Sequence, residues 1–107
     1  MIAATAATTL LFAAAALAAG AVTPARGSTR SSLVHAFVVQ DGTSVGISGV
    51  YVGGSKPVLG VVCQRTPDRG TVRFLFSRSG RSWRYLFSTG GSGRGSAVQR
   101  RLEHACR

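Results

Sequence analysis

Two neighbouring segments, residues 71–77 and 82–88, alternate strictly between large apolar and polar or smaller positions. A period of two is typical of β-strands with one buried face. A loop centred on residues 79–80 would bring all the large aromatic and branched side chains of one parity onto a single face. The predicted cross-strand pairs are Phe76 with Trp83, Phe74 with Tyr85 and Val72 with Phe87. The pattern therefore predicts an antiparallel hairpin with an aromatic inner face.

Three further strands are predicted upstream of this hairpin. Residues 58–63 form a near-continuous apolar run, which is typical of a central strand. Segments 34–40 and 43–52 flank Asp41-Gly42, a strong hairpin signal because a type I′ turn needs two positive φ angles. We therefore expect a two-residue loop at this point, with Val38 opposite Val45 and with valines on the inner face. The Thr66–Gly70 cluster predicts a turn before the aromatic hairpin.

The C-terminal region predicts one short helix after a glycine-rich link at residues 89–95. Ser96 fits an N-cap, and Gln99 three residues later would complete a capping box. An apolar stripe on the helix contrasts with three charged positions expected to face solvent. The stripe is Val98, Leu102 and Ala105, and the charged positions are Arg100, Arg101 and Glu103. The fold class that follows is mainly β: a small antiparallel sheet or sandwich of about five strands with a C-terminal helix at 97–106.

The first 25 residues form an uncharged, alanine-rich apolar leader. We interpret residues 1–25 as a secretory signal peptide with cleavage after Ala21 or Ala25, both of which follow small-x-small patterns. No Lys or Arg precedes the apolar run, so a retained anchor is the alternative. The remaining boundaries are a flexible N-terminal segment at 26–32 and a single β-rich domain at 33–107. The localisation that follows is export, to the periplasm or beyond.

Cys63 and Cys106 are the only two cysteines in the sequence. In an exported chain such a pair is most simply one disulfide, worth roughly 4 kcal/mol in the chain-entropy model. A metal site formed by these cysteines with His35 and His104 is the alternative, but no CxxC or HxxxH spacing supports it. We expect no metal and no cofactor.

The sequence carries 13 Lys and Arg against 3 Asp and Glu, for a formal net charge of +10. Arginines interleaved with aromatics suit contacts with phosphate, sulfate or carboxylate groups. The candidate anion-binding residues are Arg73, Arg78, Arg81 and Arg84 in the hairpin, and Arg94 in the glycine-rich link. The predicted register sets Arg78 opposite Arg81, where like charges need an anion to screen them. The alternatives are a solvated basic hairpin with core aromatics, and a plain flexible linker around Arg94.

The expected partner is an anionic macromolecule or an acidic protein, and an anionic membrane surface is a further candidate. Nucleic acid becomes a partner only if the leader is retained and the chain stays in the cytoplasm. Catalysis is not expected. The few acid–base side chains either have turn roles or, as with Glu103 and His104, diverge by about 100° on one helix.

The layout resembles that of VasI/TagO-like accessory proteins of type VI secretion, which are small exported β-sandwiches with a cysteine-bearing C-terminal helix. The resemblance is carried by Val58–Cys63, by Phe87–Gly91, by Ala97-Val98 with Leu102, and by Ala105-Cys106. It implies a structural accessory role in an envelope assembly and assigns no functional residue. A fainter similarity links Ser79-Gly80-Arg81 and Tyr85 to the Ser-Gly-Arg-Tyr loop of periplasmic C-type lysozyme inhibitors, which are disulfide-closed β-barrels.

Overall fold

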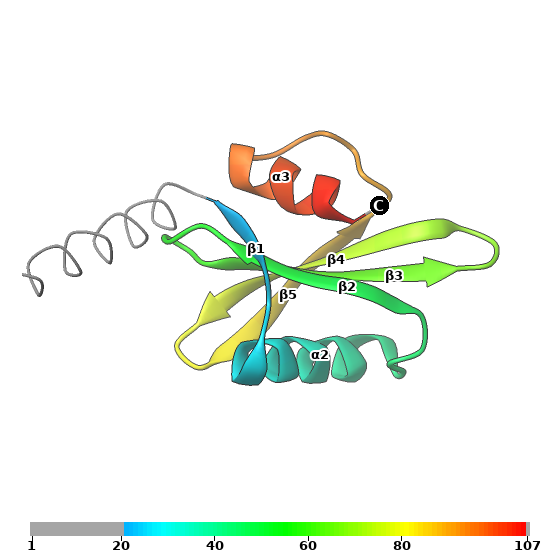
Figure 1. Ribbon diagram of the computed structural model, residues 1–107, viewed down its shortest axis with the longest axis horizontal. Helices are drawn as coiled ribbons and strands as arrows, with labels where there is room; N and C mark the ends of the chain where they lie inside the picture. Colours follow the sequence, from blue (N-terminus) through cyan, green and yellow to red (C-terminus); the bar gives the residue numbers. More distant parts are fainter. Residues whose placement is uncertain (1–20, 107) are drawn as a thin grey trace, which may run out of the picture.

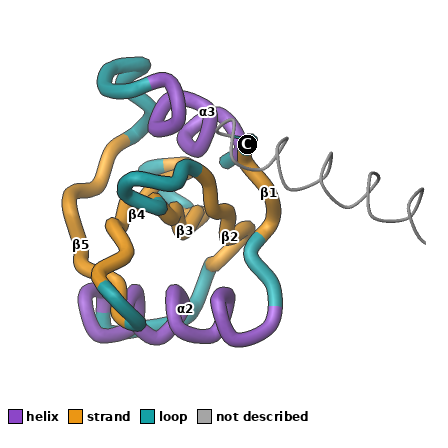
Figure 2. The backbone as a smooth tube through the Cα atoms, turned by 90° about the vertical axis from the view of Figure 1, so that its left-hand side faces the viewer, coloured by secondary structure: helices purple, strands orange, loops and turns teal. Residues whose placement is uncertain are grey.

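The computed structural model describes residues 21–106. The elements are β1 (Val22–Pro24), α2 (Gly27–Asp41), β2 (Ile47–Gly53), β3 (Leu59–Thr66), β4 (Gly70–Ser79), β5 (Ser82–Thr89) and α3 (Ala97–Ala105). The strands form one antiparallel sheet in the order β1-β2-β3-β4-β5. Helix α2 packs on one face of the sheet and α3 lies on the other (Figures 1 and 2). The mainly-β class, the five-stranded sheet and the C-terminal helix are confirmed.

The hairpin predicted around Asp41-Gly42 is wrong, because residues 27–41 form helix α2. Gly42 does adopt a positive φ of 87°, but as the left-handed residue that ends the helix, and its N–H donates to the Val38 carbonyl oxygen at 2.7 Å. No described residue other than glycine has a positive φ, so Asp41 cannot occupy a type I′ turn. Val45, expected on the inner face of the hairpin, is 75% exposed.

Burial against the sheet explains why this segment is helical. Leu33 and Phe37 lie four residues apart and both are fully buried, which a helix achieves on one face. A strand would place 33 and 37 on one face too, but with Val39 beside them, and Val39 is 74% exposed. The valine-rich run fits both periods, so tertiary packing selects between them.

The N-terminal boundary also differs from the prediction. Residues 27–32, expected in a flexible segment, form the first part of α2. The helix begins without the usual signals, since Arg26 is the N-cap, no side chain caps the first turn and no acidic residue lies there. The predicted leader falls mostly on residues 1–20, outside the described residues. Its last residues belong to the fold: Val22–Pro24 pair with β2, and the buried Ala25 donates its N–H to the Val50 carbonyl oxygen at 2.9 Å.

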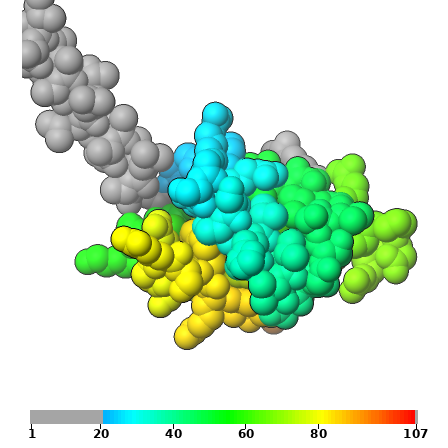
Figure 3. Space-filling view, turned by 90° about the horizontal axis from the view of Figure 1, so that it is seen from below, coloured from blue at the N-terminus to red at the C-terminus, as the bar shows by residue number. Residues whose placement is uncertain are grey.

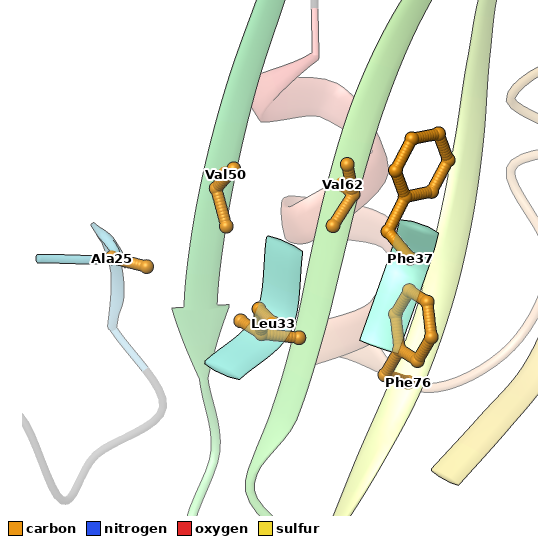
Figure 4. Packing of buried hydrophobic residues seen from close by; sticks show 6 residues of the cluster. All are labelled: Ala25, Leu33, Phe37, Val50, Val62 and Phe76. Carbon is orange, nitrogen blue, oxygen red and sulfur yellow. The ribbon is translucent and has the colours of Figure 1, made fainter. Parts of the chain in front are cut away.

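The main core lies between α2 and the sheet (Figure 4). Its buried members come from the β1–α2 connection, α2 and three neighbouring strands. They are Ala25, Leu33, Phe37, Val50, Val62 and Phe76. Aromatic edges complete it, with Phe37 and Phe74 ring centroids 4.8 Å apart at an interplanar angle of 73°. The central apolar run of 58–63 lies in β3, the middle strand, as predicted.

The β4–β5 hairpin is confirmed, but its predicted register is wrong. Phe76 lies opposite Tyr85 rather than Trp83, and Trp83 lies opposite Arg78. The connection is Gly80-Arg81, one residue later than expected, with Gly80 at φ 62°. A register irregularity between the Leu75 and Phe76 pairs also shifts the end of β5, so Phe87 pairs with Leu75 and is 39% exposed. A bulge of this kind moves side chains to the opposite face, which alternation alone does not reveal.

A second core lies between the other face of the sheet and α3. Its buried members are Val61, Cys63, Leu75, Leu102 and Cys106. Cys63 and Cys106 form the predicted disulfide, with a Cα–Cα distance of 5.5 Å. This bond ties the last described residue to β3 and is compatible with an oxidising compartment.

The predicted ends of α3 are confirmed within one residue. The Ser96 hydroxyl accepts the Gln99 N–H at 3.2 Å, as an N-cap does. The reciprocal half of the capping box is wrong, because the Gln99 amide instead donates to the Arg94 carbonyl oxygen at 3.0 Å. Glu103, expected to face solvent, is 3% exposed, and its Oε1 has no hydrogen-bond partner. Neither described helix is long and apolar enough to cross a membrane.

Candidate anion-binding groove

The tip of the β4–β5 hairpin brings two of the predicted arginines together with an aromatic ring. Ser79 and Ser82 are the last pair of the ladder, and the Ser82 hydroxyl donates to the Ser79 carbonyl oxygen at 3.0 Å. The Arg78 guanidinium lies 5.9 Å from the centroid of the Trp83 ring, and its Nε donates to the Gly80 carbonyl oxygen at 3.1 Å. These contacts hold Arg78 against the indole while leaving most of its N–H groups available.

Helix α2 and β5 border a groove of about 870 Å³. On the face shown in Figure 3, α2 in cyan to teal lies beside the yellow hairpin. The groove is lined by residues of the helix, the hairpin turn and the inner face of the sheet. They are Ser28, Ser31, Ser32, His35, Ala36, Val39, Gln40, Phe76, Arg81, Ser82, Trp83, Arg84 and Tyr85.

A smaller cavity of about 300 Å³ adjoins the groove at the start of α2. Arg78 and Arg81 line it from the hairpin, and Ser28, Thr29 and Ser32 line it from the helix. Arg81 and Trp83 border both spaces. The Trp83 indole N–H donates to the Ser32 hydroxyl at 3.0 Å, which fastens the wall between them. Arg81 is therefore the charged residue common to the two spaces.

The electrostatic character of the groove is positive. None of the 3 acidic residues of the chain lines either space. Asp41 lies at the end of α2, where its Oδ2 accepts from Gln64 at 3.1 Å, Asp68 lies in the β3–β4 turn, and Glu103 is buried on α3. The guanidinium groups of Arg78, Arg81 and Arg84 thus have no carboxylate partner in these spaces, and an external anion would meet little competition.

Arg73 does not join the other hairpin arginines. Its guanidinium reaches the C-terminal end of α3, where Nε donates to the Glu103 carbonyl oxygen at 2.7 Å and Nη2 to that of Cys106 at 2.6 Å. Nη1 donates to the carbonyl oxygens of Thr71 at 3.2 Å and Gly90 at 2.9 Å. The bonds to Glu103 and Cys106 are made at the C-terminal end of α3, where a helix has no i+4 N–H donors left for its carbonyl groups. Arg73 therefore holds the C-terminal end of α3 against the sheet, on the face opposite to α2.

Arg94 is also separated from the groove. It lies in the connection before α3, across the sheet from α2, and its backbone N–H donates to the Ser92 hydroxyl at 3.3 Å. Of the five predicted anion-binding residues, Arg81 and Arg84 line the large groove, and Arg78 and Arg81 line the smaller cavity. The predicted pairing of Arg78 with Arg81 is wrong, because Arg81 lies in the turn and Arg78 faces Trp83 across the ladder.

The sequence analysis did not predict the residues that α2 contributes to the groove. Ser28, Ser31 and Ser32 lie in the segment expected to be flexible, and His35 and Val39 lie in the segment expected to be a strand. The spacing of Leu33 and Phe37 fits a helix and a strand alike, so it did not by itself show that residues 28, 32, 35 and 39 lie on adjacent helical turns.

The described residues contain no cluster of three or more histidine, cysteine or acidic side chains placed to hold a metal ion. Cys63 and Cys106, the two cysteines of the alternative metal site, are bonded to each other in the disulfide. Comparison with known proteins adds no assignment: no family model matches this sequence, and no curated protein or solved structure was found to be similar to it.

Proposed function

We propose that this chain is an exported, non-enzymatic binding protein whose basic hairpin receives an anionic partner, foremost a polyanion of the cell envelope. One observation carries the proposal. Arg78 and Arg81 flank Trp83 beside a groove that none of the chain's acidic residues lines. Cations gathered without counter-charges raise the local concentration of anions and pair with them in geometries suited to phosphate and sulfate.

The proposed location outside the cytoplasm is supported by two features. The leader at 1–25 has the small-residue pattern of an export signal. The Cys63–Cys106 disulfide persists most readily in an oxidising environment. A chain retained in the cytoplasm with its net charge of +10 would instead meet nucleic acid as its main polyanion.

Binding to heparin fragments, a soluble sulfated polyanion, tests the proposal. We expect the affinity to fall at least tenfold between low and high salt, because each neutralised anionic group releases a counterion. The double variant Arg78→Glu/Arg81→Glu should lose most of the low-salt affinity. Isothermal titration calorimetry at two salt concentrations measures both effects.

A matched control separates this site from bulk charge. Arg69→Glu/Arg94→Glu makes the same change in net charge, but Arg69 lies in the β3–β4 turn and Arg94 lies before α3. It should retain most of the affinity. Equal losses in the two double variants would show that the overall charge, and not the groove, binds the polyanion. A heparin affinity that does not change with salt concentration would refute the proposal.

A second candidate function is a structural accessory role, which is favoured by the unpaired edge of β5 in the described sheet. In the described residues β5 pairs only with β4, and Leu86 and Phe87 on it are 37% and 39% exposed. An edge strand of this length can add a strand from a partner. Loss of a co-purifying envelope partner in Phe87→Ser, with retention in the Arg78/Arg81 variant, would favour this role over polyanion binding.

A further inference from the structure

We infer that the α2–β5 groove binds the alkyl chain of a single-chain anionic amphiphile, with the acidic headgroup of that molecule at Arg81. This inference rests on the proposed function, because it names the chemical class that the basic groove would select. Its occupant is one amphiphile molecule, with a phosphate, sulfate or carboxylate at the end of an apolar chain.

The walls of the groove are apolar over much of their length. Ala36 and Val39 contribute accessible apolar surface from α2, and Trp83 and Tyr85 contribute it from β5, above the buried Phe76. The volume of about 870 Å³ lies within the range of roughly 300–1,000 Å³ that small-molecule sites occupy. A purely polar polyanion would leave these surfaces in contact with water.

Val39 is the most informative of these residues. It is 74% exposed, whereas Leu33 and Phe37 on the same helix are fully buried. It borders the groove rather than the core, so its apolar surface is available to an occupant. Single exposed valines are common, but this one lines the same groove as Ala36, Trp83 and Tyr85, so the groove has apolar groups from both the helix and the sheet.

The charged end of the occupant is set by the positions of the cations. Arg81 borders both the large groove and the smaller cavity, where Arg78 joins it. His35 lies on the helical side of the groove. Because acidic residues line neither space, an anionic headgroup would be favoured here and a cationic one repelled. Charge and apolar surface therefore complement an amphiphile that carries both.

Trp83 provides a built-in reporter for the test. It is the one tryptophan in the sequence, and it borders both spaces. We would titrate the purified protein with hexyl, octyl and decyl phosphate below their micelle concentrations and follow Trp83 emission. Affinity should rise roughly tenfold for every two methylene groups, because each buried methylene strengthens binding by about three- to fourfold. Octyl glucoside, a neutral amphiphile, should bind at least about tenfold more weakly than octyl phosphate, because it offers no charge for Arg81 to pair with.

Two matched pairs of variants assign the effects to the groove. Val39→Ser should weaken octyl phosphate binding about threefold or more, whereas Val45→Ser, at a position equally exposed but outside the groove, should not change it. Arg81→Gln should weaken it about tenfold or more, whereas Arg69→Gln should not. All four positions are exposed, so the substitutions leave the core intact.

Thermal unfolding supplies a second readout. A ligand of the native state raises the midpoint, whereas a denaturing amphiphile lowers it. A rise with decyl phosphate, absent in Arg81→Gln, is the expected result. A fall in the midpoint, or affinity that is independent of chain length, would overturn the inference.

The outcomes also separate this inference from the proposed function. Salt-dependent heparin binding without chain-length dependence refutes the amphiphile and leaves the polyanion proposal standing. Binding only to vesicles of anionic lipid, unchanged by Val39→Ser, indicates adsorption to a membrane surface and refutes the groove as a chain-binding site. If neither heparin nor the alkyl phosphates bind the protein, both proposals are refuted.

Discussion

Arginines of one sequence segment take two different roles, set by the groups that surround each guanidinium. Arg73 and Arg78 both lie on β4, five positions apart, but Arg73 reaches the carbonyl groups at the end of α3. Arg78 instead lies over the Trp83 ring at the exposed end of the hairpin. The composition and net charge of the sequence do not distinguish Arg73 from Arg78. Their separate roles follow from which face of the sheet each one occupies and from what packs there.

Replacing Arg73 tests its role in stability. Arg73→Ala should lower the free energy of unfolding by about 1.5–3 kcal/mol, because charge-assisted hydrogen bonds to half-buried carbonyl groups are lost. Arg73→Lys should recover only part of this, since an ammonium group cannot reproduce the planar fork. Urea unfolding measures the change. Arg69→Ala, in an exposed turn, should stay within about 0.5 kcal/mol of the parent, and equal values for Arg69→Ala and Arg73→Ala would contradict the role assigned to Arg73.

At the scale of elements, α2 packs closely on the middle of the sheet because β3 carries a glycine beneath it. A Cβ added at Gly60 would lie 2.8 Å from both terminal methyl groups of Leu33 and 3.2 Å from the Trp83 ring. Leu33 is fully buried and Trp83 is hydrogen-bonded to Ser32, so neither side chain can move away freely. Gly60 therefore sets the distance between helix and sheet, and with it the position of the groove wall.

Gly60→Ala should destabilise the fold by about 1–3 kcal/mol through overpacking. It should also shift the emission of Trp83, because the added methyl group displaces the indole. Guanidinium unfolding and fluorescence check the two effects. Gly90→Ala is the matched control, since a Cβ at Gly90 meets nothing within 4 Å. A Gly60→Ala protein with parental stability would show that α2 can move outward without cost.

At the scale of the whole molecule, the fold bears on the two cleavage positions predicted for the leader. Val22–Pro24 form the edge strand β1, and Ala25 is 5% exposed in the main core. Cleavage after Ala25 would remove both, whereas cleavage after Ala21 would leave the described fold complete. Of the two predicted cleavage positions, only the one after Ala21 thus retains β1 and Ala25.

We predict that the protein recovered from its native host begins at Val22 and contains two blocked thiols. Intact mass before and after reduction and alkylation measures both features. A mass gain from alkylation only after reduction would establish the disulfide in the cell. A mature chain that begins at Arg26 would show that the fold dispenses with β1, and a full-length chain with free thiols would refute export.

The sequence by itself determined the features that depend on neighbours along the chain. The strands β4 and β5 with their hairpin, the apolar run of β3, the turn at Thr66–Gly70 and the N-cap at Ser96 follow from local signals, and each was confirmed. The disulfide followed from the presence of only two cysteines in a chain with an export-like leader.

Only the tertiary structure decided the state of residues 27–41, the register of the hairpin and the separation of the arginines. The segment at 33–39 satisfies both helical and strand patterns, and burial of Leu33 and Phe37 against the sheet selects the helix. The groove depends on that choice, because its second wall is α2. The physical reason is general: local propensities differ by about 1 kcal/mol or less for each residue, whereas burying a large side chain contributes about 1.5–3 kcal/mol.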